Sequence, residues 1–281
     1  MAFDVRAYLE RIGGARSLVN DRDRLTPSLA TLQALQSAQM RAIAFENIDV
    51  FLGGVPDLDS SAIWKRMVIG RRGGYCLELN RLFAGVLDAF GFETLPVLGR
   101  VRMGAPVGGP RAHHAFVVSI DGGEWLADTG FGGPGPVGPV SLSTEEPQLI
   151  GGDTFRIMRD HAAGELVLQR LNGKDWFSLY GFDRVPVTEA DFIAANVVCS
   201  RWEKSPFPQH LMMTVATAEG RASLFNRSVK LVRAGEVHGW EIASLTELQS
   251  VLVDLFGLQV EAPIAVAVWR KLQAEQAPEA A

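Results

Sequence analysis

Cys76 is the side chain of this sequence best placed to do covalent chemistry. It follows two arginines, two glycines and a tyrosine at 71–75 and lies in the first turn of a predicted helix. The unpaired N–H groups and the dipole of a helix start favour thiolate over thiol, and Arg71 or Arg72 adds to this. A thiolate is the form of cysteine that attacks acyl groups. The alternative is a small buried core residue, and position alone does not separate the two.

A nucleophilic cysteine needs a base and a group that orients the base. Of the five histidines, His113 and His114 begin a predicted strand over 114–120, and Asp128 ends the returning strand over 124–128. The Asp-Gly-Gly turn between these strands predicts a hairpin, which brings Asp128 beside His113 within reach of a hydrogen bond. Together with the cysteine they predict a Cys-His-Asp triad. The residues alone leave the choice between the two adjacent histidines open.

The other candidate groups carry less signal. Cys199 lacks the glycine-arginine context and is interpreted as a core or surface thiol. No metal site is predicted, because no cysteine or histidine pair other than His113-His114 occurs at a spacing typical of metal ligands.

The elements that position these groups change type along the chain. Helical periodicity is found at 5–12, from Thr26-Pro27 to about residue 43, from an N-cap at Asp59, and from Tyr75 to Gly91. Short strand patterns with Gly and Asp turns then predict a small barrel or sandwich. The predicted strands are 114–120, 124–128, 154–158, 165–170 and 176–182, followed by strands 211–216 and 228–233 and a helix over 245–256.

Composition limits the class of protein. The 281 residues are 47% hydrophobic and 21% charged, which is typical of a globular protein with a sizeable core. A net charge of −5 argues against nucleic acid as the main partner. Only two cysteines occur, so a disulfide framework is not expected. No apolar stretch reaches the length of a membrane span, and the start of the sequence does not resemble a secretory signal. A cytoplasmic enzyme with no membrane partner is predicted.

Four motifs in order resemble the arylamine N-acetyltransferase family. They are FENIDV at 45–50, RGGYCLELN at 72–80, RAH at 111–113 and DTGFGG at 128–133. The sequence departs from the family's usual pattern at Ala44, where proline is common, and in the segment 196–210.

The resemblance implies an α+β fold with a cysteine-protease-like triad. The expected parts are an N-terminal helical bundle over 1–92, a central β-barrel over 93–200 and a C-terminal α/β lid over 201–281. The implied reaction is ping-pong: acetyl-CoA acetylates Cys76, and an aromatic amine or hydrazine then takes the acetyl group. The resemblance selects His113 as the base and Asp128 as its orienting partner, with acetyl-CoA as cosubstrate and no metal.

The family match also implies roles around the triad. Glu46, Asn47 and Arg72 resemble a buried polar network that holds the site, whereas Phe45, Phe131 and Gly132 resemble the lining of the acyl and amine pocket. A homodimer is left open. The alternatives are an amide synthase that closes a macrolactam, a cysteine hydrolase with the same triad, and a non-catalytic binding module.

Overall fold

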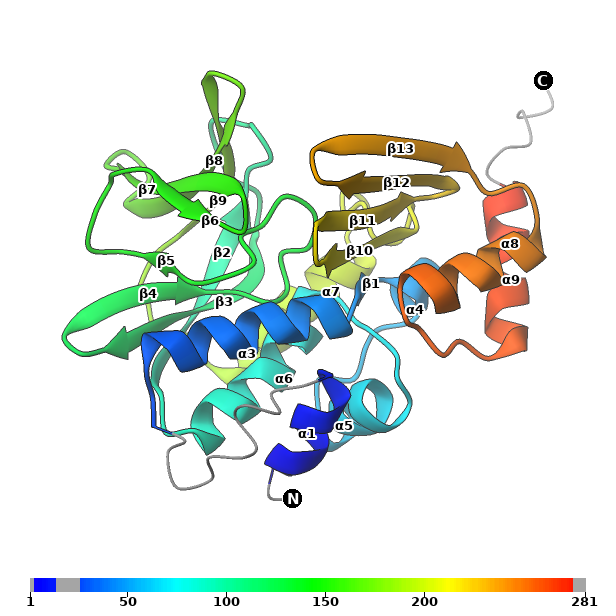
Figure 1. The fold of residues 1–281 in the computed structure, drawn as a ribbon, viewed down its shortest axis with the longest axis horizontal. Coiled ribbons are helices and arrows are strands. Elements are labelled where there is room, and N and C mark those ends of the chain that lie inside the picture. Colours follow the sequence, from blue (N-terminus) through cyan, green and yellow to red (C-terminus); the bar gives the residue numbers. More distant parts are fainter. Residues whose placement is uncertain (1–2, 14–25, 275–281) are drawn as a thin grey trace.

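The N-terminal third of this computed structural model is helical, as the periodicity predicts (Figure 1). The structure describes residues 3–13 and 26–274; residues 1–2, 14–25 and 275–281, which belong to the predicted first and third parts, lie outside this description. The helical elements are α1 (Val5–Arg11), α3 (Leu29–Ala42), α4 (Ile48–Phe51), α5 (Ser60–Trp64), the π-helical η2 (Lys65–Ile69) and α6 (Cys76–Ala89).

Two predicted helix starts have different outcomes. Asp59 caps α5, because its carboxylate accepts a hydrogen bond from the Ser61 N–H at 2.8 Å. Helix α3 begins later than predicted, with Ser28 as its N-cap in place of Thr26. The Ser28 hydroxyl accepts from the Thr31 N–H at 3.2 Å, and this side-chain cap sets the helix start at Leu29.

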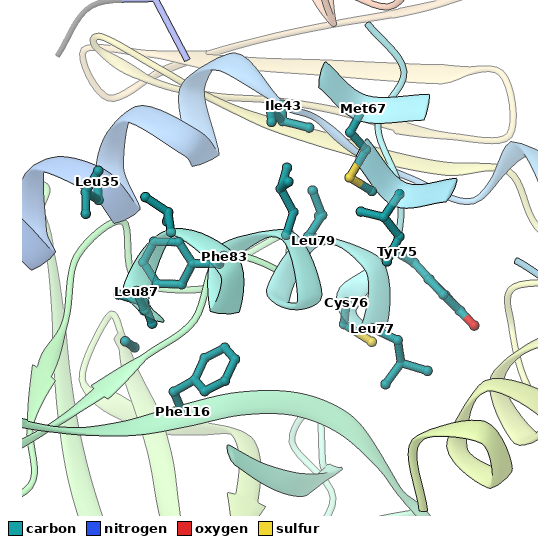
Figure 2. Packing of buried hydrophobic residues seen from close by; sticks show 14 of the residues in the cluster. Leu35, Ile43, Met67, Tyr75, Cys76, Leu77, Leu79, Phe83, Leu87 and Phe116 are labelled. Carbon is teal, nitrogen blue, oxygen red and sulfur yellow. The ribbon is translucent and has the colours of Figure 1, made fainter. Parts of the chain in front are cut away.

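Helix α6 lies between the other N-terminal helices and the barrel. It contacts α1 and α5 on one side and the barrel strands β2 (Glu93–Val101) and β3 (Arg111–Ile120) on the other. Leu79 and Phe83 are fully buried along its length, and Figure 2 shows them packed in the same cluster as Tyr75 and Cys76. Burial on both sides fixes the start of the helix, and with it the cysteine.

Eight antiparallel strands form a nearly closed barrel in the order β5-β4-β3-β2-β9-β8-β7-β6. The strand β5 at one edge also contacts β6 and β7 at the other edge. The sequence pattern does not predict β2, because Pro96 and Gly99 interrupt its alternation. The remaining strands are β4 (Gly123–Ala127), β5 (Val140–Ser141), β6 (Gln148–Ile150), β7 (Asp153–Asp160), β8 (Glu165–Asn172) and β9 (Asp175–Phe182).

The predicted hairpin of β3 and β4 is confirmed. Val118 pairs with Trp125 and Ile120 with Gly123. The two turn residues Asp121 and Gly122 have φ values of 50° and 75°, the left-handed region that a tight hairpin turn requires. The hairpin therefore returns the chain beside the start of β3.

A second antiparallel sheet combines both ends of the chain. Its order is β1-β10-β11-β12-β13, and its first strand comes from the N-terminal third, where Phe45 pairs with Thr214. Ala44, Ile48 and Phe51 share a hydrophobic core with this sheet and the C-terminal helices. The elements are β1 (Phe45–Glu46), β10 (Met212–Thr217), β11 (Gly220–Phe225), β12 (Ser228–Arg233), β13 (Glu236–Glu241), α8 (Leu245–Ser250), the π-helical η3 (Val251–Leu255) and α9 (Ala262–Ala274).

Helix α7 (Glu189–Arg201) follows the last barrel strand and packs against β3. Its residues Phe192, Ala195 and Cys199 belong to the same hydrophobic core as α6. The division into 1–92, 93–200 and 201–281 stays a prediction. Within the described ranges, no helix is long and apolar enough to cross a membrane.

Candidate active site

Cys76 is the first residue of α6, as the sequence predicts. Tyr75 has extended backbone angles before it, and the Glu78 carboxylate accepts a hydrogen bond from the Tyr75 N–H at 3.2 Å. The Cys76 side chain is buried, and its thiol donates to the carbonyl oxygen of Ala112 over 3.8 Å. This contact brings the start of α6 to the residue before His113.

The two glycines before Cys76 serve close packing. A Cβ atom on Gly73 would lie 2.1 Å from the Ala44 carbonyl oxygen, and one on Gly74 would lie 2.3 Å from the Met67 methyl group. The left-handed residue of this segment is Arg71, with φ 49°. Two glycines before a helix start suggest a tight turn at that place, but the turn lies earlier, at Arg71, and the glycines let the chain pass next to β1.

His113 and Asp128 are hydrogen-bonded. Nε2 of His113 lies 2.7 Å from Oδ2 of Asp128, and both side chains are buried. The other ring nitrogen, Nδ1, remains for Cys76, with which the imidazole interacts. The structure thus brings together the three residues predicted to form the triad.

Five donors hold the Asp128 carboxylate. Oδ1 accepts from Asn80 Nδ2 at 2.9 Å and from the N–H groups of Gly130 and Phe131 at 2.8 and 3.1 Å. Oδ2 accepts from the Tyr180 hydroxyl at 2.9 Å in addition to His113. Burial raises the pKa of Asp128, but the positive charge of His113 and these hydrogen bonds outweigh it, so the pKa is lowered. The carboxylate is therefore ionised although it is buried.

The pKa of His113 is raised to about 10. Burial alone would lower it, but the charge of Asp128 and the hydrogen bond to it raise it more, and Cys76 acts in the same direction. The pKa of Cys76 is also raised, because the adjacent Cys199 thiol and burial outweigh the lowering effect of His113. Cys76 and His113 thus favour each other's charged form. The group that favours a thiolate here is the imidazolium.

His114 has a different environment from its neighbour. Its ring packs against Phe116 and Phe192, with centroids 4.6 and 4.5 Å apart. Burial and the charge of His113 lower its pKa to about 3, so the ring is neutral and serves packing.

The polar residues predicted near the site, Glu46, Asn47 and Arg72, form an ion-pair cluster and a set of hydrogen bonds to the backbone. Glu46 is fully buried and pairs with Arg72 at 2.7 Å and with Arg66 at 3.3 Å. Asn47 donates to the carbonyl groups of Phe207 and His210 at 2.8 and 2.7 Å and accepts from the Met212 N–H at 2.7 Å. Its side chain thus joins β1 to the segment that leads into β10.

A narrow cleft lies near the triad residues: Thr129, which follows Asp128, is part of its lining, whereas Cys76, His113 and Asp128 are not. Phe45 and Gly132 line this cleft, together with the charged residue Arg221. Their part in the acyl and amine pocket stays a prediction. Phe131 contacts the His113 ring edge-on, with centroids 5.1 Å apart. The lining consists of Met40, Ile43, Phe45, Thr129, Gly132, Gly133, Gly135, Val137, Thr214, Ala216, Gly220 and Arg221. Among the described residues, no group of three His, Cys, Asp or Glu side chains is arranged to hold a metal ion.

Three residues of the site were not predicted from the sequence. The Asn80 side chain donates to both Asp128 and the His114 carbonyl. It lies four residues after Cys76 in the same motif, so the sequence could have predicted that both residues share one helix face. Tyr180 and Cys199 come from β9 and α7, and no local pattern connects them with the nucleophile.

Comparison with known proteins gives consistent matches. The sequence model of a family described as N-acetyltransferase matches residues 28–265. The arylamine N-acetyltransferase / N-hydroxyarylamine O-acetyltransferase of Salmonella typhimurium is 32% identical over 238 residues, which cover 83% of this chain and 84% of that protein. The arylamine N-acetyltransferase of Mycolicibacterium smegmatis is 32% identical over 266 residues, with 92% and 94% covered. The solved structure of Mycobacterium marinum arylamine N-acetyltransferase in complex with CoA matches with a TM-score of 0.86 at 29% identity, over 96% of this chain and 99% of that one.

Proposed function

This chain belongs to the arylamine N-acetyltransferase family, and from that premise we propose that it transfers acetyl from acetyl-CoA to an arylamine or hydrazine through Cys76. The observation that carries the assignment of residues is the buried pair of His113 and Asp128, 2.7 Å apart, next to the thiol at the start of α6. The matches favour acetyl transfer over a macrolactam-forming amide synthase or a cysteine hydrolase.

The first half-reaction acetylates the cysteine. His113 takes the proton of the Cys76 thiol, and the resulting thiolate attacks the carbonyl carbon of the thioester. The coenzyme A thiolate leaves and takes the proton from the imidazolium. Backbone N–H groups at the start of α6 are suited to hold the oxygen of the tetrahedral intermediate.

The second half-reaction passes the acetyl group to the amine. The amine nitrogen attacks the acyl-cysteine, His113 accepts its proton, and Cys76 is released. Asp128 holds Nε2 of His113, so Nδ1 handles protons at the sulfur, and its charge stabilises the imidazolium. The carboxylate is itself fixed by its other donors, and the imidazole therefore keeps one orientation through both steps.

The cleft near the triad supports an approach of the substrates from this side of the molecule. Phe45 supplies an apolar wall that suits an aromatic ring, and Gly132 leaves the backbone uncovered there. The CoA complex of the Mycobacterium marinum relative supports CoA as the acyl carrier. A ping-pong reaction requires acetyl-CoA and the amine to reach Cys76 in turn, and we propose that both approach from the side of this cleft.

Intact-protein mass spectrometry tests the proposal. We expect the wild-type protein to gain one acetyl group on mixing with acetyl-CoA alone and to lose it on addition of an aromatic amine. The matched Cys76→Ser protein should gain none. If the wild-type protein gains no acetyl group while iodoacetamide still labels Cys76, the acyl donor is a different one, and the amide synthase or hydrolase replaces this proposal.

Two wider predictions follow from the sequence. A cytoplasmic location suits the two cysteines, which are both free in the structure. A homodimer is an open prediction that size-exclusion chromatography with light scattering would decide.

A further inference from the structure

Cys199 lies directly beside the proposed nucleophile. It is buried in α7, and its thiol donates to the Ala112 carbonyl oxygen over 3.6 Å. Cys76 donates to the same oxygen over 3.8 Å, and the two thiols interact with each other. One backbone oxygen therefore holds the sulfur atoms of two cysteines that are far apart in the sequence.

Contacts on both sides of Cys199 fix this arrangement. Asn196, one turn earlier in α7, accepts a hydrogen bond from the hydroxyl of Tyr75 and donates to the Pro56 carbonyl at 2.8 Å. After Cys199, the Ser205 hydroxyl donates to the Cys199 carbonyl at 2.6 Å. Helix α7 is thus attached to Tyr75, the N-cap of α6, and the backbone of Cys199 cannot move away from Cys76 without breaking buried hydrogen bonds.

Nearness of a second thiol changes the fate of an oxidised cysteine. A sulfenic acid on an isolated cysteine continues to sulfinic and sulfonic acids, whereas a neighbouring thiol condenses with it to a disulfide. Peroxides oxidise the thiolate form of cysteine. His113 favours that form of Cys76, although the Cys199 thiol and burial together raise the pKa of Cys76.

We propose that Cys76 and Cys199 form a reversible redox pair in which Cys199 captures Cys76 after oxidation by hydrogen peroxide. The Cys76 thiolate attacks one peroxide oxygen, the O–O bond breaks, and the leaving hydroxide takes the proton from His113 to form water. The Cys199 sulfur then attacks the Cys76 sulfur, the S–O bond breaks, and hydroxide leaves with the Cys199 proton as a second water. Both thiols are oxidised and one peroxide is reduced to two waters.

The disulfide would block acetyl transfer and protect the nucleophile. A sulfur in a disulfide cannot attack a thioester, and a thiol reductant restores both cysteines. This effect on activity rests on the proposed function, since it requires Cys76 to be the nucleophile. Formation of the disulfide does not, so the mass of the oxidised protein tests the pair on its own.

The experiment treats the wild-type protein with a small excess of hydrogen peroxide. We expect its mass to fall by two hydrogen atoms, a peptide joining Cys76 to Cys199 to appear in a non-reducing digest, and dithiothreitol to restore mass and acetyl transfer fully. A free Cys199 thiol beside an oxidised Cys76, a disulfide between two molecules, or no oxidation at either residue would each overturn the proposal.

Substitution of Cys199 supplies the matched control. Cys199→Ser and Cys199→Ala should gain two or three oxygen atoms at Cys76 under the same treatment, and dithiothreitol should not reverse this. Recovery is expressed as a fraction of each variant's own activity before oxidation. A change in folding or basal rate therefore does not affect the comparison between variants. Full recovery in both variants would show that Cys199 does not capture Cys76.

Discussion

Replacing Tyr180 with phenylalanine removes a single oxygen atom from the buried side of the proposed triad. The hydroxyl donates to Oδ2 of Asp128 over 2.9 Å, and this is the atom that also bonds His113. The side chain is fully buried, so water does not replace the lost donor freely. A hydrogen bond to a charged acceptor contributes about 1.5–3 kcal/mol. We expect the free energy of unfolding of Tyr180→Phe to fall by this amount.

The same change should slow acetylation of Cys76 about tenfold. Without the hydroxyl, the Asp128 carboxylate keeps its bonds through Oδ1 but loses the donor that aligns Oδ2 with the imidazole. If the lower end of the lost energy, about 1.5 kcal/mol, is also lost in the transition state, the rate falls by slightly more than about tenfold.

Tyr8→Phe is the matched control. Tyr8 is fully buried as well, but its hydroxyl donates to the neutral amide of Gln39 over 2.6 Å. We expect a loss of about 0.5–1.5 kcal/mol in stability, typical of a neutral pair, and an unchanged acetylation rate.

Urea unfolding gives the stabilities, and single-turnover release of nitrophenolate from p-nitrophenyl acetate gives the acetylation rate without coenzyme A. The reasoning is refuted if Tyr180→Phe loses stability but acetylates Cys76 as fast as the wild type, because the hydroxyl would then not position the triad. Equal behaviour of the two variants in both assays would refute it as well.

Three further predictions concern the same region. Asp128→Asn should lower the pKa of His113 from about 10 to below its ordinary value of about 6.5, because burial then dominates. The pH profile of Cys76 alkylation by iodoacetamide should shift with this pKa, and an unchanged profile would contradict the prediction. Gly130→Ala places a Cβ atom 2.7 Å from the Cys76 Cα and should cost about 1–3 kcal/mol and slow acetylation, as urea unfolding and the ester assay would show. Glu46→Ala removes a buried carboxylate from two partly buried arginines, which both keep Asp49 as a partner, and should cost about 1–3 kcal/mol in the same unfolding assay, whereas an unchanged stability would argue against the ion pairs.

The sequence predicts those parts of the site that depend on local pattern. The hairpin that returns Asp128 to His113 follows from alternation and a two-residue turn, and both are local signals. The start of α6 at Cys76 follows from the glycines and the apolar periodicity after them. Asn80 was within reach of the same reasoning, because residues four apart share a helix face.

The remaining residues depend on packing between distant segments. Tyr180 reaches Asp128 because β9 pairs with β2 as its neighbour in the barrel. Nothing in the sequence of either strand specifies this pairing. Cys199 reaches Cys76 through the position of α7 on β3, although the weak amphipathic pattern of α7 gives no orientation. The two residues of β1 are too few to show any periodicity.

The pairing of β1 with β10 has a consequence for synthesis of the chain on the ribosome. Asn47 binds the Met212 N–H across 165 residues, so β1 leaves the ribosomal tunnel long before its partner strand exists. Until then the apolar side chains of Ile48 and Phe51 lack the sheet that buries them. The nascent chain can complete the barrel and the hydrogen bond from His113 to Asp128 earlier, but the cleft is completed only when β10 and β11 are added. Acetyl transfer should therefore appear abruptly, close to the end of translation, and a release-arrested ribosome series would locate that point.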